Sequence, residues 1–246
     1  MKDLTAIICV MVFTLLAPPA WSEEAKGPWS GKVGLGFQRN SGNTDNESLN
    51  ANIEVNYAPD HWHHQGIAKV NKKDEDAGTT AEAYKLKYEG RFNLSDRTFL
   101  FGLVDYNRDK FSNYDQQIFE IVGIGHGLVR TGKHALDLQL GAGASQNDLA
   151  DGNDDPGAAE AGANEFTLRV SGDYTWTFSE TASFSQKLNV NSGSTNTYSE
   201  SLSELRAGIA GNIFMVLTYS IKHNTDVQPD KEKTDSHTGV NLEYVF

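Results

Sequence analysis

The sequence predicts an all-β protein, a transmembrane antiparallel up-and-down β-barrel of about 12 strands with short periplasmic turns and longer extracellular loops. Three observations lead to this fold class. Segments of about ten residues alternate apolar and polar side chains, long and short polar breaks alternate between them, and the chain closes on an aromatic residue, Phe246. Such alternation turns one face of each strand to lipid and the other to a polar lumen.

The first residues have the parts of a signal peptide. Lys2 gives a charged start, the apolar run from Leu4 to Ala17 is too short to span a bilayer as a helix, and small residues lie up to Ser22, where a signal peptidase would cut. We therefore expect export to the cell outer membrane. The expected divisions are a signal peptide at 1–22, a short periplasmic N-terminal segment at 23–28 and the barrel at 29–246.

The composition narrows the function classes. Lys and Arg number 21 against 33 Asp and Glu, a net charge of -12, and this acidity argues against nucleic acid, whose phosphates a binder must neutralise. The single cysteine, Cys9, lies in the expected signal peptide. The mature chain would then have no thiol for catalysis or metal binding, and we expect no cofactor.

Alternation is clearest in residues 48–57, where Leu49, Ile53 and Tyr57 fall on one face and Asn50 and Glu54 on the other. The other alternating segments carry their apolar residues, in chain order, at Val33, Leu35 and Phe37; Tyr84, Leu86, Tyr88 and Phe92; Leu136, Leu138, Leu140 and Ala142; Phe166, Leu168, Val170, Tyr174 and Trp176; Met215, Leu217, Tyr219 and Ile221; and Val240, Leu242, Tyr244 and Phe246. Residues 97–107 and 116–129 are apolar on both faces, and the pattern leaves the phase of 62–71 open.

The breaks between segments alternate in length, as periplasmic turns and extracellular loops do. The long polar breaks fall at 41–46, 72–80, 108–115, 146–164, 191–197 and 224–234. The short ones fall at Pro59-Asp60, Asn93 to Asp96, Thr131-Gly132-Lys133, Ser179-Glu180 and Gly211-Asn212. Aromatic residues gather at segment ends, where they would form an interfacial girdle, at Trp29, Tyr57, Trp62, Phe92, Trp176, Phe178 and Tyr244.

The polar faces carry charges that we expect to point into the lumen. They are Lys32, Glu54, Lys69, Lys85, Lys87, Glu89, Arg91, Asp137, Arg169, Asp173 and Lys187. Two interpretations stay open: the charges could pair and fill the barrel, or a basic stripe, strongest at Lys85, Lys87 and Arg91, could pass small anions. Barrels of about eight strands are filled and those of sixteen or more are open, so about 12 falls between the two classes.

Metal binding and catalysis have weaker support. His61, His63 and His64 surround Trp62, but alternation sends His63 and His64 to opposite faces, so we expect no metal site there. The acidic loop 146–164 lacks the closing glutamate of an EF-hand, which favours a solvated loop over a Ca²⁺ site. No motif joins a nucleophile to any of the four remaining histidines, His126, His134, His223 and His237, although His223 and His237 could lie near each other on the last two strands.

Three segments carry a family resemblance. They are Ser41-Gly42-Asn43-Thr44-Asp45 after the opening strand, Tyr198-Ser199-Glu200-Ser201-Leu202, and the close from Asp235 to Phe246. Together they resemble the YdiY-like "salt-induced outer membrane protein" family, a domain of unknown function, over residues 29–246. The resemblance implies an outer-membrane barrel and brings no established activity.

The functional expectation is an outer-membrane barrel that is either structural or a narrow, anion-preferring pore, and not an enzyme. The alternatives are a membrane-embedded lipid hydrolase and a soluble periplasmic β-barrel binding protein. The expected partners are outer-membrane lipid, lipopolysaccharide and, during insertion, the barrel-assembly machinery. No nucleic acid is expected, and a monomer is favoured.

Overall fold

The computed structural model describes residues 27–41, 46–75, 78–109, 114–149, 165–227 and 231–246. The expected signal peptide at 1–22, most of the segment 23–28 and most of the acidic loop 146–164 lie outside the described residues. The strands are β1 (Trp29–Ser41), β2 (Asn46–Tyr57), β3 (Trp62–Glu75), β4 (Gly78–Asn93), β5 (Thr98–Asp109), β6 (Tyr114–Arg130), β7 (His134–Leu149), β8 (Glu165–Ser179), β9 (Ala182–Ser192), β10 (Thr197–Ala210), β11 (Ile213–Asn224) and β12 (Thr234–Val245). In these ranges no helix has the length and apolar character needed to cross a membrane.

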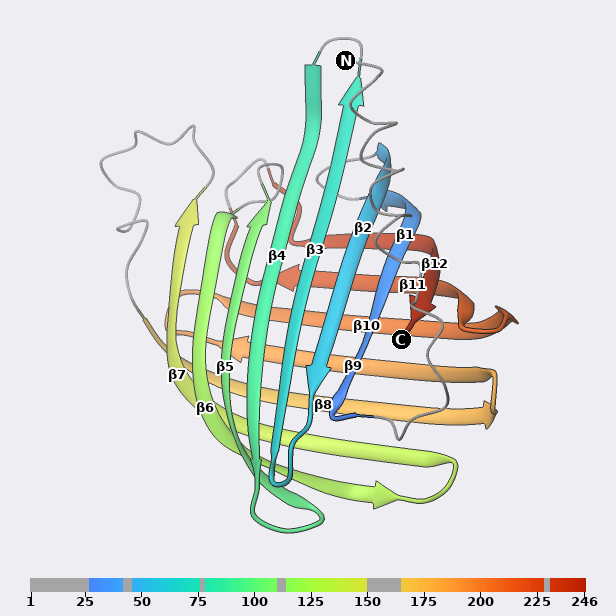
Figure 1. Cartoon of the computed structure of the whole chain (residues 1–246). Coiled ribbons are helices and arrows are strands. Elements are labelled where there is room, and N and C mark those ends of the chain that lie inside the picture. Colours follow the sequence, from blue (N-terminus) through green and yellow to red (C-terminus); the bar gives the residue numbers. More distant parts are fainter. Residues whose placement is uncertain (1–26, 42–45, 76–77, 110–113, 150–164, 228–230) are drawn as a thin grey trace.

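The twelve strands form one closed antiparallel barrel in which each strand pairs with its neighbours in sequence. Figure 1 shows β2 to β5 across the front of the molecule and β8 to β12 behind them. The fold class expected from the alternating pattern is therefore confirmed, including the number of strands.

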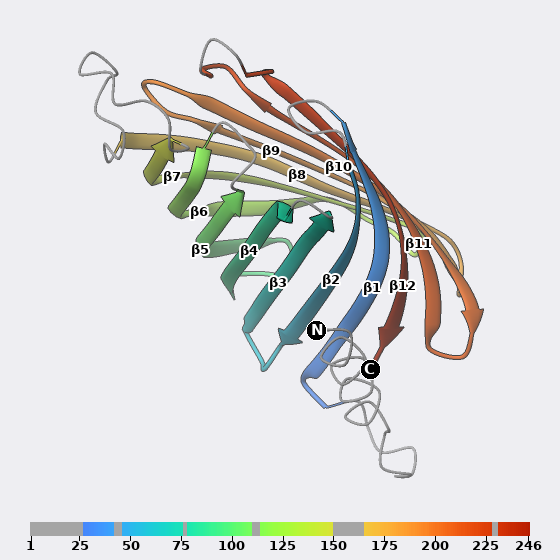
Figure 2. The same cartoon turned by 90° about the horizontal axis from the view of Figure 1, so that it is seen from above.

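The seam of the barrel joins the first strand to the last. β1 and β12 lie side by side in Figure 2, in a register that runs from Lys32 opposite Val245 to Ser41 opposite Ser236. Beyond this ladder the backbones of Gly31 and Phe246 exchange two hydrogen bonds of 3.0 Å. The Phe246 ring covers Gly31 so closely that a side-chain carbon at Gly31 would lie 2.5 Å from it. Phe246 thus completes the closure of the barrel.

The outer wall is apolar, as lipid requires. Large apolar side chains such as Val122 and Leu140 are 68% and 60% exposed on it. Aromatic pairs lie at the end where the short turns fall, with ring centroids 4.4 Å apart for Trp29 and Tyr57 and 5.0 Å apart for Trp62 and Phe92. This arrangement is typical of an interfacial girdle.

Several strands run further than the polar pattern predicted. The expected break at 72–80 was wrong, because Asp74 still pairs with Thr79 and Glu75 with Gly78, after a register shift at Lys73. The break expected from 146 begins only after Leu149. Outside the bilayer both faces of a hairpin meet water, so strand pairing continues without any apolar alternation.

β5 and β6, apolar on both faces, supply an apolar cluster inside the barrel. Phe99, Phe101 and Leu103 of β5 and Phe119 and Ile121 of β6 are each at most 4% exposed and point inward. The rings of Phe99 and Phe101 lie opposite Gly125 and Gly123, where the absence of a Cβ leaves room for them against the wall. The departure from alternation therefore marks the strands that fill the lumen.

The phase of β3, which the pattern left open, follows from its register with β2. Ala68 lies opposite Ile53 and Ile67 opposite Glu54. Since Ile53 is exposed on the outer wall, Ala68 and Val70 share that wall. Ile67 and Lys69 line the lumen instead.

Candidate functional site in the barrel lumen

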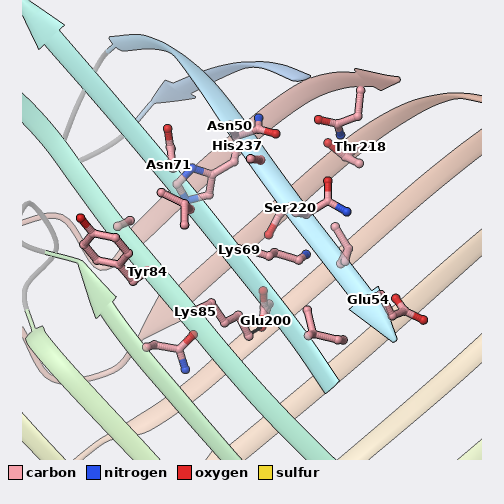
Figure 3. Close-up of a pocket in the computed structure, with 18 of the residues that line it drawn as sticks. Asn50, Glu54, Lys69, Asn71, Tyr84, Lys85, Glu200, Thr218, Ser220 and His237 are labelled. Atoms are coloured by element: carbon pink, nitrogen blue, oxygen red, sulfur yellow. Dashed lines mark hydrogen bonds and ion pairs between the residues drawn. The ribbon is translucent and has the colours of Figure 1, made fainter. Parts of the chain in front are cut away.

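An ion pair crosses the lumen. Lys85 of β4 meets Glu200 of β10 with 3.3 Å between Nζ and Oε2, and these two strands lie opposite each other in the ring of twelve. Lys85 also pairs with Asp105 of β5 at 3.5 Å. Figure 3 shows Lys85 and Glu200 in contact, with Lys69 above them. Opposite walls of the barrel are thus connected at this level.

Two further contacts cross the lumen, each between β6 and the wall that contains β10 and β11. Tyr198, two residues before Glu200 on the same face of β10, stacks on Phe119 of β6 with ring centroids 5.9 Å apart. The Tyr114 hydroxyl at the start of β6 donates to the carbonyl oxygen of Asp226, which follows β11, at 3.3 Å. Together with the Lys85–Glu200 pair, these contacts divide the lumen into a packed half and an open half.

The packed half, lined by β4 to β9, is filled by the apolar cluster and by paired charges. Glu89 is 2% exposed and accepts from Arg91 at 2.6 Å and Gln139 at 3.1 Å, while Lys87 lies 3.0 Å away. Asp137 pairs with Arg91 at 3.6 Å and also contacts Arg130. In this half the carboxylates of Glu89 and Asp137 each contact two cationic side chains.

Arg169 and Asp173 also belong to the inward set expected from the sequence. Arg169 is 3% exposed and donates to Asn191 at 2.9 Å and to Asn189 at 2.5 Å. Asp173 is half-buried and lies opposite Asp137 on β7 and Lys187 on β9. Arg169 is therefore tightly held in the wall of β8 and β9.

The open half contains a cavity of about 210 Å³. Its lining comes from β1 to β5 and from β9 to β12 (Figure 3). The charged and titratable side chains around it include Lys32, Glu54, Lys69, Lys85, Lys187, Glu200, Glu204, Lys222, His237 and Glu243. Five of the eleven expected lumen residues, Lys32, Glu54, Lys69, Lys85 and Lys187, line this one cavity.

Some of these charges are paired and others are not. Lys32 bridges Glu54 at 3.6 Å and Glu243 at 3.4 Å. By contrast, three ammonium groups, those of Lys69, Lys187 and Lys222, form no hydrogen bond or ion pair within the described part of the chain. Lys69 is exposed to the solvent of the lumen. The open half therefore presents free cationic groups from β3, β9 and β11.

Sequence reasoning missed the contribution of β10. Its inward face carries Tyr198, Glu200, Glu204 and Arg206, but serines alternate with them and both faces look polar. Glu204 accepts a hydrogen bond from Ser185 at 3.3 Å, and the guanidinium of Arg206 lies 3.6 Å above the ring of Phe214. The register with β11, which puts Glu200 opposite Lys222 and Glu204 opposite Thr218, identifies the inward face.

The histidines form no common site. Nδ1 of His64 is hydrogen bonded to the Tyr88 hydroxyl at 2.8 Å, and no metal-ligating cluster occurs among the residues that the structure describes. His223 and His237, which could have lain together on the last two strands, do not: His223 lies opposite Thr234, while His237 lies opposite Ser220, three positions along β11. That odd spacing puts the two rings on opposite faces of the wall.

The closed ring of twelve antiparallel strands, apolar outside and charged inside, defines an outer-membrane-type β-barrel. A sequence model of the family described as "Protein of unknown function, DUF481" matches residues 33–246, and the chain belongs to that family. It is 26% identical to "Uncharacterized protein YdiY" of Escherichia coli (strain K12) over 236 residues, 95% of this chain and 88% of that protein. The resemblance expected from the three sequence segments is confirmed.

Solved barrels share the architecture at low identity. The NanC porin has a TM-score of 0.55 and 10% identity, over 86% of this chain and 98% of its own. An outer membrane channel from Pseudomonas putida F1 has a TM-score of 0.52 and 10% identity, over 94% and 100%. The translocator domain of the autotransporter NalP from Neisseria meningitidis has 0.52 and 11%, over 99% and 98%. These similarities show the fold.

Proposed function

We propose that the protein is a narrow pore of the outer membrane that favours small anions. The observation that carries this proposal is the half-open lumen, whose cavity is lined by Lys69, Lys187 and Lys222, three lysines that form no ion pair with any residue the structure describes. Solutes would pass through this half only, because the other half is packed. The porin and the channel named above support a pore through their shared fold.

The preference for anions follows from the pairing of the lumen charges. A lysine that already contacts a carboxylate, such as Lys32 between Glu54 and Glu243, has little residual potential at a distance. The unpaired ammonium groups dominate the local field and lower the electrostatic cost of an entering anion. Glu204 reduces this field in part, since it lies within electrostatic range of Lys32, Lys69 and Lys187.

The export route, the insertion and the membrane surroundings that we propose are those expected from the sequence. The protein would be exported through the signal peptide at 1–22, inserted by the barrel-assembly machinery and surrounded by outer-membrane lipid and lipopolysaccharide. The exposed apolar wall supports a lipid environment. A monomer is proposed because each barrel has its own closed lumen.

Planar-bilayer recording tests the pore. Purified protein in a KCl gradient should give stepwise currents whose reversal potential has the sign expected for chloride. Replacing Lys69, Lys187 and Lys222 together with Gln should move the reversal potential towards zero or to the cation side. Lys133→Gln is the matched control, because Lys133 is exposed in the turn between β6 and β7. Cation selectivity of the unaltered protein, or an equal shift with Lys133→Gln, would contradict anion preference, and absence of current would contradict the pore.

A further inference from the structure

Glu200 has an unusual place among the lumen carboxylates. Glu54 and Glu243 pair with Lys32, which lies on the strand next to each of them. Glu200 instead spans the lumen to Lys85 on the opposite wall. Its direct neighbour in register is Lys222 of β11, and with that lysine it forms no ion pair within the described residues. The carboxylate of Glu200 is therefore placed in the lumen and away from the wall that carries it.

The surroundings of this carboxylate are cationic on three strands. Lys85 contacts it at 3.3 Å, and Lys69, directly opposite Lys85 on β3, lies within electrostatic range together with Lys222. Tyr198 lies two residues before Glu200 on the same face of β10, and its hydroxyl is within electrostatic range of the carboxylate. Lysine ammonium groups with one neutral hydroxyl donor form a suitable environment for an oxyanion.

We infer that Lys69, Lys85, Lys222 and the Tyr198 hydroxyl form a binding site for a small carboxylate anion, and that the side chain of Glu200 occupies this site in the structure. The inference deepens the proposed pore function and rests on it for its physiological role. A carboxylate that enters the cavity competes with Glu200 for the same donors. Its binding releases the bridge between β4 and β10, and this release couples recognition of the solute to widening of the path.

The competition explains why the site would be selective and also weak. Glu200 is tethered to the wall, so its effective concentration at Lys85 is high. A free carboxylate must therefore be present at a high concentration before it displaces Glu200. Asp105 keeps a second contact to Lys85 at 3.5 Å, so Lys85 remains held in place when Glu200 leaves. Only an anion small enough for a cavity of about 210 Å³ can replace the side chain.

Acetate is the probe for the site, because it reproduces the carboxylate that Glu200→Ala removes. In the full-length mature protein in detergent, acetate should raise the thermal unfolding midpoint of the Glu200→Ala variant by a few degrees and have a much smaller effect on the unaltered protein, where the tethered Glu200 competes for the site. Adding Lys85→Gln to Glu200→Ala should abolish the shift. Glu204→Ala, which removes another inward carboxylate of β10, is the matched control and should show no shift.

Conductance gives a second measurement. Glu200→Ala should conduct more than the unaltered protein, and about 100 mM acetate in place of chloride should reverse at least half of that gain if binding is in the millimolar range. Glu200→Gln keeps the side-chain length and replaces the alanine variant in this measurement if that variant fails to insert. Its conductance should respond to acetate in the same direction.

The outcomes separate the two proposals. An acetate shift that depends on Lys85 in a protein that carries no current would support the site and contradict the pore. Current without any acetate effect on either Glu200 variant, or an equal effect on Glu204→Ala, would overturn the site and leave the pore standing.

Discussion

The contact between Gly123 and Phe101 inside the barrel gives a sharp stability prediction. A side-chain carbon at Gly123 would lie 2.6 Å from the Cα of Gly141 and 2.7 Å from the Phe101 ring, and it would also meet the carbonyl oxygen of Leu140. Two of these three neighbours are backbone atoms of β7, which the strand ladder holds in place. Gly123→Ala must therefore displace a strand or push the Phe101 ring out of the cluster.

The expected cost follows from the packing. Forcing extra atoms into a filled core costs about 1–3 kcal/mol. The control is Gly102→Ala on the neighbouring strand β5, where an added carbon meets nothing within 4 Å. At this open position the change from glycine should be neutral or stabilising by roughly 0.5–1 kcal/mol. The two variants should therefore differ by about 1–4 kcal/mol in unfolding free energy.

Urea unfolding in detergent micelles, followed by the gel shift between folded and unfolded forms, measures this difference. Gly123→Ala should unfold at a lower urea concentration than the unaltered protein, and Gly102→Ala at the same or a higher one. Equal midpoints for the two variants would refute the close packing of Phe101 against β6 and β7.

Two more predictions concern the division of the lumen. Glu89→Ala should destabilise the barrel by about 3 kcal/mol, because it leaves Lys87, Arg91 and Gln139 without their buried partner. Glu54→Ala in the open half should cost about 1 kcal/mol or less. Similar urea midpoints for the two variants would contradict the packed half. Tyr198→Ala removes the stack on Phe119, so it should raise the single-channel conductance and admit larger neutral polymers in a polymer-exclusion assay. Tyr219→Ala, on the exposed outer wall, should change neither the conductance nor the polymer exclusion. Unchanged exclusion with Tyr198→Ala would show that this ring does not limit the path.

The outer wall was predictable from the sequence because lipid imposes a local rule. Every second residue of a membrane strand must be apolar, so runs such as Val240, Leu242 and Tyr244 identify strand and face together. The turns followed from their own polar residues, and Asp60 and Gly211 indeed adopt positive φ values of 41° and 51°. Each of these features depends on neighbours in sequence.

The lumen was less predictable because its contacts are distant in sequence. Lys85 and Glu200 are separated by 115 positions, and nothing local to either segment indicates that they meet. The prediction of the eleven lumen-facing residues from Lys32 to Lys187 relied on alternation alone. It did not include β10, because the serines on the outer face of β10 resemble the polar residues of a lumen face. The apolar residues on both faces of β5 and β6 were a signal of the packed half, since lipid accounts for only one apolar face.

The seam at Gly31 and Phe246 also constrains the order of assembly. The ladder between β1 and β12 joins residues that are about as far apart in sequence as the chain allows, so loop-closure entropy opposes it until the intervening strands have paired. The free edge of β1 must therefore stay unpaired, and protected from other chains, until β12 is in place to pair with it. The two backbone hydrogen bonds between Gly31 and Phe246 belong to this late step, because they form only when β1 and β12 meet.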